Sequence, residues 1–351
     1  MAFSHTAPRI EFQELEDEIR RLTDKERNDL ERDLYGKYDN EISMEPNNKL
    51  CISSLVELRK VLNDMDPDET KVYRRALQQC PMYVTSESFL LCFLRAEDFH
   101  IENAAKRLIR YWNEKYELFG EDHTFGPITL KSLQSNDLNV IQNGGFAILP
   151  KDEHGRIVIH RDRVATKVKQ NGRDSALRAF FYLVHVAIED DFEAQRKGMV
   201  ILSASQFAFQ LENHDRIYMK RLFYLILSCL PIRTVSYHIV GAFLSANFST
   251  MVMPSLHWLM GTHMSLRHRV HNGTSKHKLQ TSLAMYGITK IPTFLGGNVE
   301  YNGKSWLEKR RIDEIHFRDP WRKSSCNIRT PKIVYSIENN MASFFPFMQF
   351  S

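Results

Sequence analysis

Apolar residues recur every three to four positions through the first third of the chain, a spacing typical of helices that bury one face. Leu15, Ile19 and Leu22 follow this spacing. Thr23 stands three residues before Glu26, which predicts a capping box at the start of a second helix. Similar patterns predict helices from about residue 86 and from about residue 101. The N-terminal third is therefore expected to be helical.

Short apolar runs alternate with longer helical patterns beyond Pro127. The polar, glycine-ended segment 151–155 predicts a hairpin turn between the first two runs. Strands that alternate with helices need crossover connections, so the sequence predicts an α/β fold with a mainly parallel sheet. The predicted strands are 146–149, 156–160, 199–202, 235–240 and 267–271. The predicted helices are 174–196, 215–229, 248–264 and 279–286.

Composition narrows the class of protein. The chain has 351 residues, 43% hydrophobic and 26% charged, with a net charge of +4, which does not require a nucleic-acid partner. No run approaches the roughly 18–20 apolar residues that span a bilayer. The N-terminus has no apolar signal region, and the five cysteines are scattered. We therefore expect a cytoplasmic protein.

Motifs for catalysis are missing from the sequence. There is no glycine-rich phosphate loop and no G-x-S-x-G elbow. Five histidines lie close together in the sequence without the ligand spacing of a zinc site: His257, His263, His268, His271 and His277. We expect no enzymatic activity, no catalytic residue, no metal and no cofactor.

Several short motifs occur in a fixed order between residues 70 and 300. They are the helical segment 88–99, the alanine pair Ala104-Ala105, the hairpin Asp152-Glu153-His154-Gly155-Arg156, the helix end 193–198, Pro231, and Ile291-Pro292-Thr293-Phe294-Leu295-Gly296-Gly297. This set resembles the CRAL-TRIO lipid-binding family, whose members include phosphatidylinositol, tocopherol and retinaldehyde transfer proteins. Where phosphatidylinositol-type members carry a glutamate, this chain has Ile232, which disfavours phosphatidylinositol as the ligand.

The resemblance implies a domain organisation. Residues 1–65 would be an N-terminal helical extension, and 66–125 the family's N-terminal helical domain. Residues 126–300 would be the CRAL-TRIO lipid-binding domain, with a hydrophobic pocket beside the sheet. Residues 301–351 would be a basic, aromatic C-terminal tail.

The segment 248–264 is apolar on nearly every face. Such a helix is either buried core or a membrane-contacting surface. By resemblance it is the gate of the lipid pocket. Phe181, His185 and Ile188 share one helical face, although a histidine among apolar neighbours is more often a hydrogen-bonded core residue. The full set of predicted lipid-binding residues is Phe181, His185, Ile188, Val200, Leu202, Tyr237, Ile239, Phe248, Met251, Val252, Leu256, Leu259 and Met260.

Basic residues near these segments suit an anionic membrane surface or a lipid head group, although any single basic run can also be solvated surface. The predicted contacts are Arg161, Arg163, Lys167, Arg233, Arg267 and Arg269. The expected function is to bind one hydrophobic ligand and to transfer or present it at membranes as a peripheral protein. The ligand classes that fit are a phospholipid, a phosphoinositide, or a tocopherol- or retinoid-like molecule. The alternative is a lipid-sensing adaptor that recruits a protein partner through the N-terminal helices or the C-terminal tail.

Overall fold

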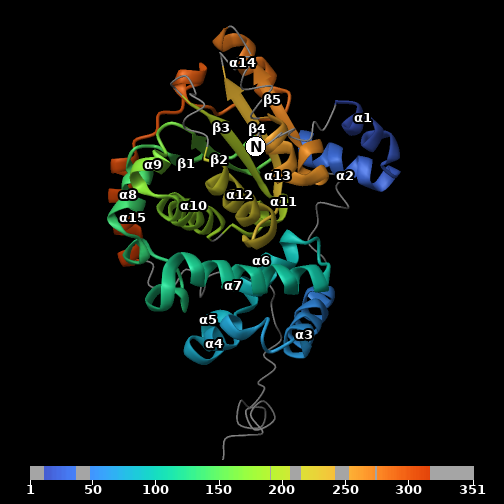
Figure 1. The fold of residues 1–351 in the computed structure, drawn as a ribbon, viewed down its shortest axis with the longest axis vertical. Helices are drawn as coiled ribbons and strands as arrows, with labels where there is room; N and C mark the ends of the chain where they lie inside the picture. Colours follow the sequence, from blue (N-terminus) through green and yellow to red (C-terminus); the bar gives the residue numbers. More distant parts are fainter. Residues whose placement is uncertain are drawn as a thin grey trace, which may run out of the picture.

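A computed structural model describes residues 12–36, 48–189, 191–205, 215–241, 253–272 and 275–316. An α/β body occupies the upper part of the molecule, and a group of helices lies below it (Figure 1). Cys51, Cys92 and Cys229 are buried, and Cys80 is half-buried.

The body is built on one five-stranded sheet whose strands follow the chain order. The strands are β1 (Phe146–Leu149), β2 (Ile157–Asp162), β3 (Met199–Ala204), β4 (Thr234–Gly241) and β5 (His268–Asn272). β1 and β2 form an antiparallel hairpin, and the pairs from β2 to β5 are parallel. The predicted α/β fold with a mainly parallel sheet is therefore confirmed, and all five predicted strands are present.

The strand order determines which face the helices cover. Parallel neighbours joined in sequence by right-handed crossovers place every connecting helix on the same face. The connections from β2 to β5 contain α9 (Val168–Asn171), α10 (Arg173–Ile188), α11 (Phe192–Lys197), α12 (Arg216–Tyr224), the π-helical turn η3 (Leu225–Cys229) and α13 (Met253–Leu266). The predicted single helix 174–196 is wrong: α10 ends at Ile188, and Asp191 caps a separate helix, α11.

Alternation along the strands separates two hydrophobic clusters. Ile159, Ile201 and Tyr237 join the large cluster with the connecting helices. Val158 and Val200 point to the opposite face and join a smaller cluster. That second face is covered by α14 (Lys276–Ala284) and by the turn η5 (Thr293–Leu295).

The motif at residues 291–297, which contributes Ile291 and Leu295 to the smaller cluster, depends on close backbone packing. A Cβ atom at Gly297 would lie 1.9 Å from the carbonyl oxygen of Ile291. Gly296 has φ of 97°, a left-handed conformation that favours glycine. The two glycines therefore allow the chain to turn back, and Pro292 pairs with Val299.

The N-terminal helices divide between two places. α3 (Asn48–Asp64), α4 (Lys71–Gln79), α5 (Pro81–Val84), α6 (Glu87–Ala96) and α7 (Ile101–Thr124) form the lower group (Figure 1). α1 (Phe12–Arg21) and α2 (Asp24–Tyr35) lie beside the body instead, where α1 contacts α13 and α2 contacts β4. The described helices of the expected extension 1–65 therefore lie in two places.

The caps and the C-terminal part of the chain follow local rules. The predicted capping box of Thr23 and Glu26 is present, and Gly36 ends α2 in a left-handed conformation. η1 (Leu130–Ser132) and α8 (Ser135–Gln142) lead into β1. α15 (Gly303–His316) packs on α8, and Glu314 accepts a hydrogen bond from Tyr182 of α10 at 2.7 Å. The described part of the expected tail is thus a packed helix.

Candidate functional site

α13 is the part of the predicted gate that the structure describes. The fourteen residues from Met253 to Leu266 include no Asp, Glu, Lys or Arg. Leu256 and Met260 are buried in the large cluster, whereas Trp258 is 61% exposed. The helix is interrupted at Gly261, where φ is 67°. One side of α13 therefore packs on the core, and the other presents an apolar aromatic side chain to solvent.

Three predicted gate residues, Phe248, Met251 and Val252, lie outside the described residues. The remaining predicted lipid-binding residues are all described, but they lie on both faces of the sheet. Val200 and Leu202 belong to the small cluster beneath α14. These two strand residues are therefore separated by the sheet from the others, since alternation directs them away from the connecting helices. The large cluster contains Phe181, Ile188, Tyr237, Ile239, Leu256 and Met260, with Leu259 packed against it.

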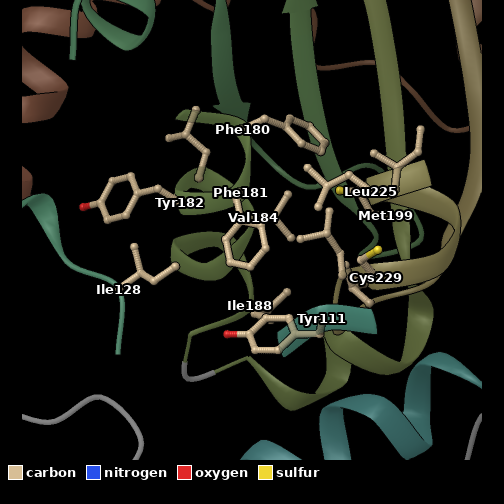
Figure 2. Close-up of a cluster of buried hydrophobic side chains, with 14 of the residues drawn as sticks. Tyr111, Ile128, Phe180, Phe181, Tyr182, Val184, Ile188, Met199, Leu225 and Cys229 are labelled. Carbon is tan, nitrogen blue, oxygen red and sulfur yellow. The ribbon is translucent and has the colours of Figure 1, made fainter. Parts of the chain in front are cut away.

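α10 uses its predicted pocket face for a different contact. The ring of Phe181 lies 5.4 Å from that of Tyr111 on α7, whereas Phe180 lies 5.1 Å from Phe146 on β1. Figure 2 shows Tyr111 beside Ile188 and below Phe181, with Phe180 pointing away from them. Phe181 thus joins α10 to the lower helices rather than to the sheet.

His185 is buried on this same face, and both of its ring nitrogens have protein partners. Nδ1 lies 2.7 Å from the carbonyl oxygen of Phe181, and Nε2 lies 3.1 Å from the hydroxyl of Tyr111. Because the carbonyl only accepts, Nδ1 carries the proton and Nε2 accepts from Tyr111. Burial lowers the pKa of His185 to about 3, so the ring is neutral. This placement fits the alternative of a hydrogen-bonded core histidine.

A polar group lies at the carboxyl ends of the central strands. Arg161 near the end of β2 is paired in register with Ser203 near the end of β3. Its Nη1 atom lies 3.4 Å from the hydroxyls of both Ser203 and Tyr237, and its guanidinium lies over the ring of Tyr218 on α12. In parallel sheets, this edge is where ligands bind most often. We call Arg161, Ser203, Tyr218 and Tyr237 the arginine cluster.

The other predicted head-group residues occupy varied surroundings. Lys167 is exposed, and Arg163 is partly buried and donates to the carbonyl of Val240 at 3.2 Å. Arg269 donates to the carbonyl oxygens of Leu266 and His268. Arg161 and Arg267 are buried, so neither is placed as a surface contact for a membrane.

Arg233 and Arg267 instead line a charged cleft of about 330 Å³ between α2, the α6–α7 turn and the end of α13. Asp33 of α2, which is buried, lies within ion-pair distance of both. Acidic and basic residues are equally represented in the lining of this cleft. The charged side chains therefore form a network that joins helices. Its charged residues are Asp29, Arg32, Asp33, Glu97, Asp98, Arg107, Arg233 and Arg267.

Sequence reasoning missed Asp33, Ser203 and Tyr218. Ser203 could have been found, because it extends a predicted strand by one residue. It lies two residues after Ile201, so alternation directs its side chain to the same face of the sheet. Tyr218 follows the helical spacing of its segment but carries no motif. Asp33 gave no signal, since its partners are distant in the chain.

Among the described residues, no group of three or more His, Cys, Asp or Glu side chains is arranged to hold a metal ion. No helix in the same part of the chain is both long enough and apolar enough to cross a membrane.

Comparisons with known proteins give likenesses to solved structures. No protein-family model matches the chain, and no curated protein matches it significantly. Among 28 matching chains of solved structures is one described as the crystal structure of Sfh5. It superposes with a TM-score of 0.45 at 15% identity, over 77% of this chain and 100% of that one. A likeness of this degree says nothing of function.

Proposed function

We propose that this chain binds one hydrophobic ligand between the helical face of the sheet and the helices α12 and α13, and presents or transfers it at membranes. The observation that carries the proposal is α13 itself. A helix without a single charged side chain packs one side on the core and leaves Trp258 exposed on the other. Tryptophan is favoured at membrane–water interfaces, where an apolar ring can insert while its N–H stays hydrated.

The energetics support a helix that can move. Each methylene that enters an apolar site contributes about 0.8 kcal/mol, so a chain of about 16 carbons contributes on the order of 13 kcal/mol. A carrier must offer an interior of similar dryness and must open it at a membrane. Methionine side chains repack easily, and Met253, Met260 and Met264 lie along α13. Rotation at Gly261 would let the first part of α13 swing while Leu266 stays fixed.

In this proposal the protein carries its ligand and does not change it chemically. The protein acts on no bond, needs no cofactor and associates with membranes peripherally. Its membrane contacts are Trp258 and the exposed Lys167, while the buried arginines serve inside the protein.

Native mass spectrometry of the purified protein tests binding. We expect one lipid of defined mass per chain, released on denaturation. A vesicle assay then tests transfer, and labelled lipid should move between vesicles faster when the protein is added. A bound lipid without accelerated transfer would support the adaptor alternative. Protein that stays empty after incubation with mixed lipid vesicles would contradict the proposal.

A further inference from the structure

Arg161 is a buried cation whose contacts are weak. It is only 6% exposed, and its two hydroxyl contacts, to Ser203 and Tyr237, are both 3.4 Å long. Its third contact is to the sulfur of Met219 at 3.2 Å. Well-formed N–H···O hydrogen bonds are about 2.7–3.2 Å long, so none of the oxygens holds the guanidinium firmly.

Polar atoms in the arginine cluster also lack partners. Arg161 Nε and the hydroxyl of Tyr218 are buried without a well-formed hydrogen bond among the described residues. The two side chains still interact, since burial raises the pKa of Tyr218 and the adjacent Arg161 guanidinium opposes that rise. Tyr218 is 1% exposed. A buried polar atom without a partner costs about 1–3 kcal/mol, and charged groups cost more. Two such atoms on side chains in direct contact would be stabilised by an added hydrogen-bonding group.

Three other buried arginines have a different arrangement, since each has a carboxylate partner. Arg156 meets Asp152 at 2.5 Å, Arg178 meets Asp137 at 2.8 Å, and Arg267 meets Asp33 at 2.8 Å. Within the described residues, no carboxylate lies within ion-pair distance of Arg161. An uncompensated buried charge costs several kcal/mol, so a negatively charged group bound beside Arg161 would be stabilising.

A second arginine, Arg163, lies near Arg161, and the Asp162 carboxylate partly offsets its charge. The pKa of Arg163 is lowered to about 10 by burial and by the nearby charge of Arg161. Asp215, the acid closest in sequence to Tyr218, is held by Arg173 at 2.8 Å and caps α12. The cluster therefore presents a guanidinium and three hydroxyls, which together suit one anionic group of two or three oxygens.

We propose that Arg161 binds the anionic end of the ligand, a carboxylate or a phosphate carried on an apolar chain. This inference rests on the proposed function and names the ligand class of the same site. The Arg161 guanidinium donates to the anion, and the hydroxyls of Tyr218, Tyr237 and Ser203 donate around it. The apolar chain lies along the sheet face by Ile239 and under α13. The preferred ligand is then an acidic amphiphile rather than a neutral alcohol or hydrocarbon.

Delipidated full-length protein provides the test, with three ligands that share one 18-carbon chain. Calorimetry would compare oleate, oleoyl-lysophosphatidic acid and oleyl alcohol, with inorganic phosphate as a fourth probe. We expect at least one acidic lipid to bind about 10- to 100-fold more tightly than the alcohol, as for hydrogen bonds to a charged group. Inorganic phosphate should not bind at comparable concentration. Phosphate alone binding as tightly as the lipids would overturn the lipid assignment.

The variants separate the site from bulk charge. Arg161→Met should abolish the preference for acidic lipid and leave oleyl alcohol binding within about threefold, since only the anion contact is lost. Arg216→Met, which removes an exposed charge two residues before Tyr218, should keep the preference. Tyr218→Phe retains the arginine and should weaken acidic-lipid binding by up to about tenfold. It serves as the deciding variant if Arg161→Met does not fold.

The outcomes distinguish the two proposals. Equal affinity for the acid and the alcohol in the wild type would refute the anion site and leave lipid binding intact. No binding of any lipid would refute both. Unliganded Arg161→Met should melt no lower than the wild type, because it removes an uncompensated charge. A clearly lower Tm, with the lipid preference retained in Tyr218→Phe, would make Arg161 a structural residue and overturn the inference.

Discussion

Arg267 Nε donates to Asp33 Oδ2 over 2.8 Å, a contact between residues 234 positions apart in the chain. Arg267 directly follows the last residue of α13, and Asp33 lies in the last turn of α2. Arg233 and Arg32 also lie 3.6 Å from the Asp33 carboxylate. One buried aspartate thus joins the N-terminal helices to the end of the proposed gate, where it would hold the fixed part of α13.

Replacing Asp33 with Asn should therefore destabilise the protein strongly. The variant leaves buried Arg267 without its carboxylate, and breaking such a pair costs about 3–5 kcal/mol. Urea unfolding would measure the loss, and hydrogen exchange should show faster exchange in 253–266. The matched control is Asp29→Asn, which removes a carboxylate whose side chain is one-third exposed and which pairs with Arg32. A cost below about 1 kcal/mol is expected there. Equal costs for the two variants would contradict the role of Asp33.

The two sides of α13 should respond differently to truncation. Leu256→Ala removes a buried side chain and should lower the free energy of unfolding by about 2–5 kcal/mol. Trp258→Ala removes an exposed one and should change stability by about 0.5 kcal/mol or less. Co-sedimentation with lipid vesicles should show the reverse order, with Trp258→Ala binding less. Unchanged vesicle binding by Trp258→Ala would show that α13 does not meet the membrane.

Much of the fold could be predicted because it depends on local patterns. Alternation and apolar runs located all five strands to within two residues at each end, and Thr23 with Glu26 located a helix start. The hairpin motif is also explained locally: Asp152 accepts from the backbone N–H of Arg156 at 2.8 Å and pairs with its side chain. What the pattern could not show is that Arg156 continues to the carbonyl of Asp33, because that contact depends on the tertiary fold.

The candidate site was harder to predict for the same reason. Alternation placed Val200 and Ile201 on opposite faces but could not say which face carries the connecting helices. The handedness of the crossovers determines which face the helices cover, but only when the spatial order of the strands is known. The arginines near the strand ends were predicted as membrane or head-group contacts from their charge alone. A charged residue in a sequence is usually expected to be exposed. Arg161 and Arg267 are buried instead. Arg267 pairs with Asp33 from a distant segment, whereas Arg161 is enclosed by side chains of β3, β4 and α12.

Arg310 on α15 should contribute to stability although it belongs to a basic segment. It pairs with Glu189 at 2.7 Å and with Glu314 at 3.2 Å, and it donates to the Tyr182 hydroxyl. Arg310→Met should lower the free energy of unfolding by about 1–3 kcal/mol, since it removes the ion pairs with Glu189 and Glu314 and the donor to Tyr182. Arg311→Met, at the exposed neighbouring position, should change it by about 0.5 kcal/mol or less. Guanidinium unfolding compares them, and equal effects would argue against a docked α15.

His185 should make the protein sensitive to acid. Its pKa is lowered from 6.5 to about 3 by burial, so the folded state keeps the ring neutral while the unfolded state takes up a proton below pH 6.5. Stability from this group is therefore complete above pH 6.5 and is lost as the pH falls toward 3. The loss is roughly 1–2 kcal/mol per pH unit, or about 3 kcal/mol by pH 4.5.

His185→Gln removes this dependence, so the stability gap between wild type and variant should narrow by about that amount from pH 6.5 to 4.5. Urea unfolding at each pH measures the gap. Tyr111→Phe is the matched control, because it removes the hydroxyl partner of Nε2 and keeps the ring. The control should lose stability at every pH and retain the wild-type slope. A gap between wild type and His185→Gln that stays constant with pH would mean that His185 takes up its proton at the same pH in the folded and unfolded states. Its hydrogen bonds to Phe181 and Tyr111 would then need a different proton arrangement at low pH.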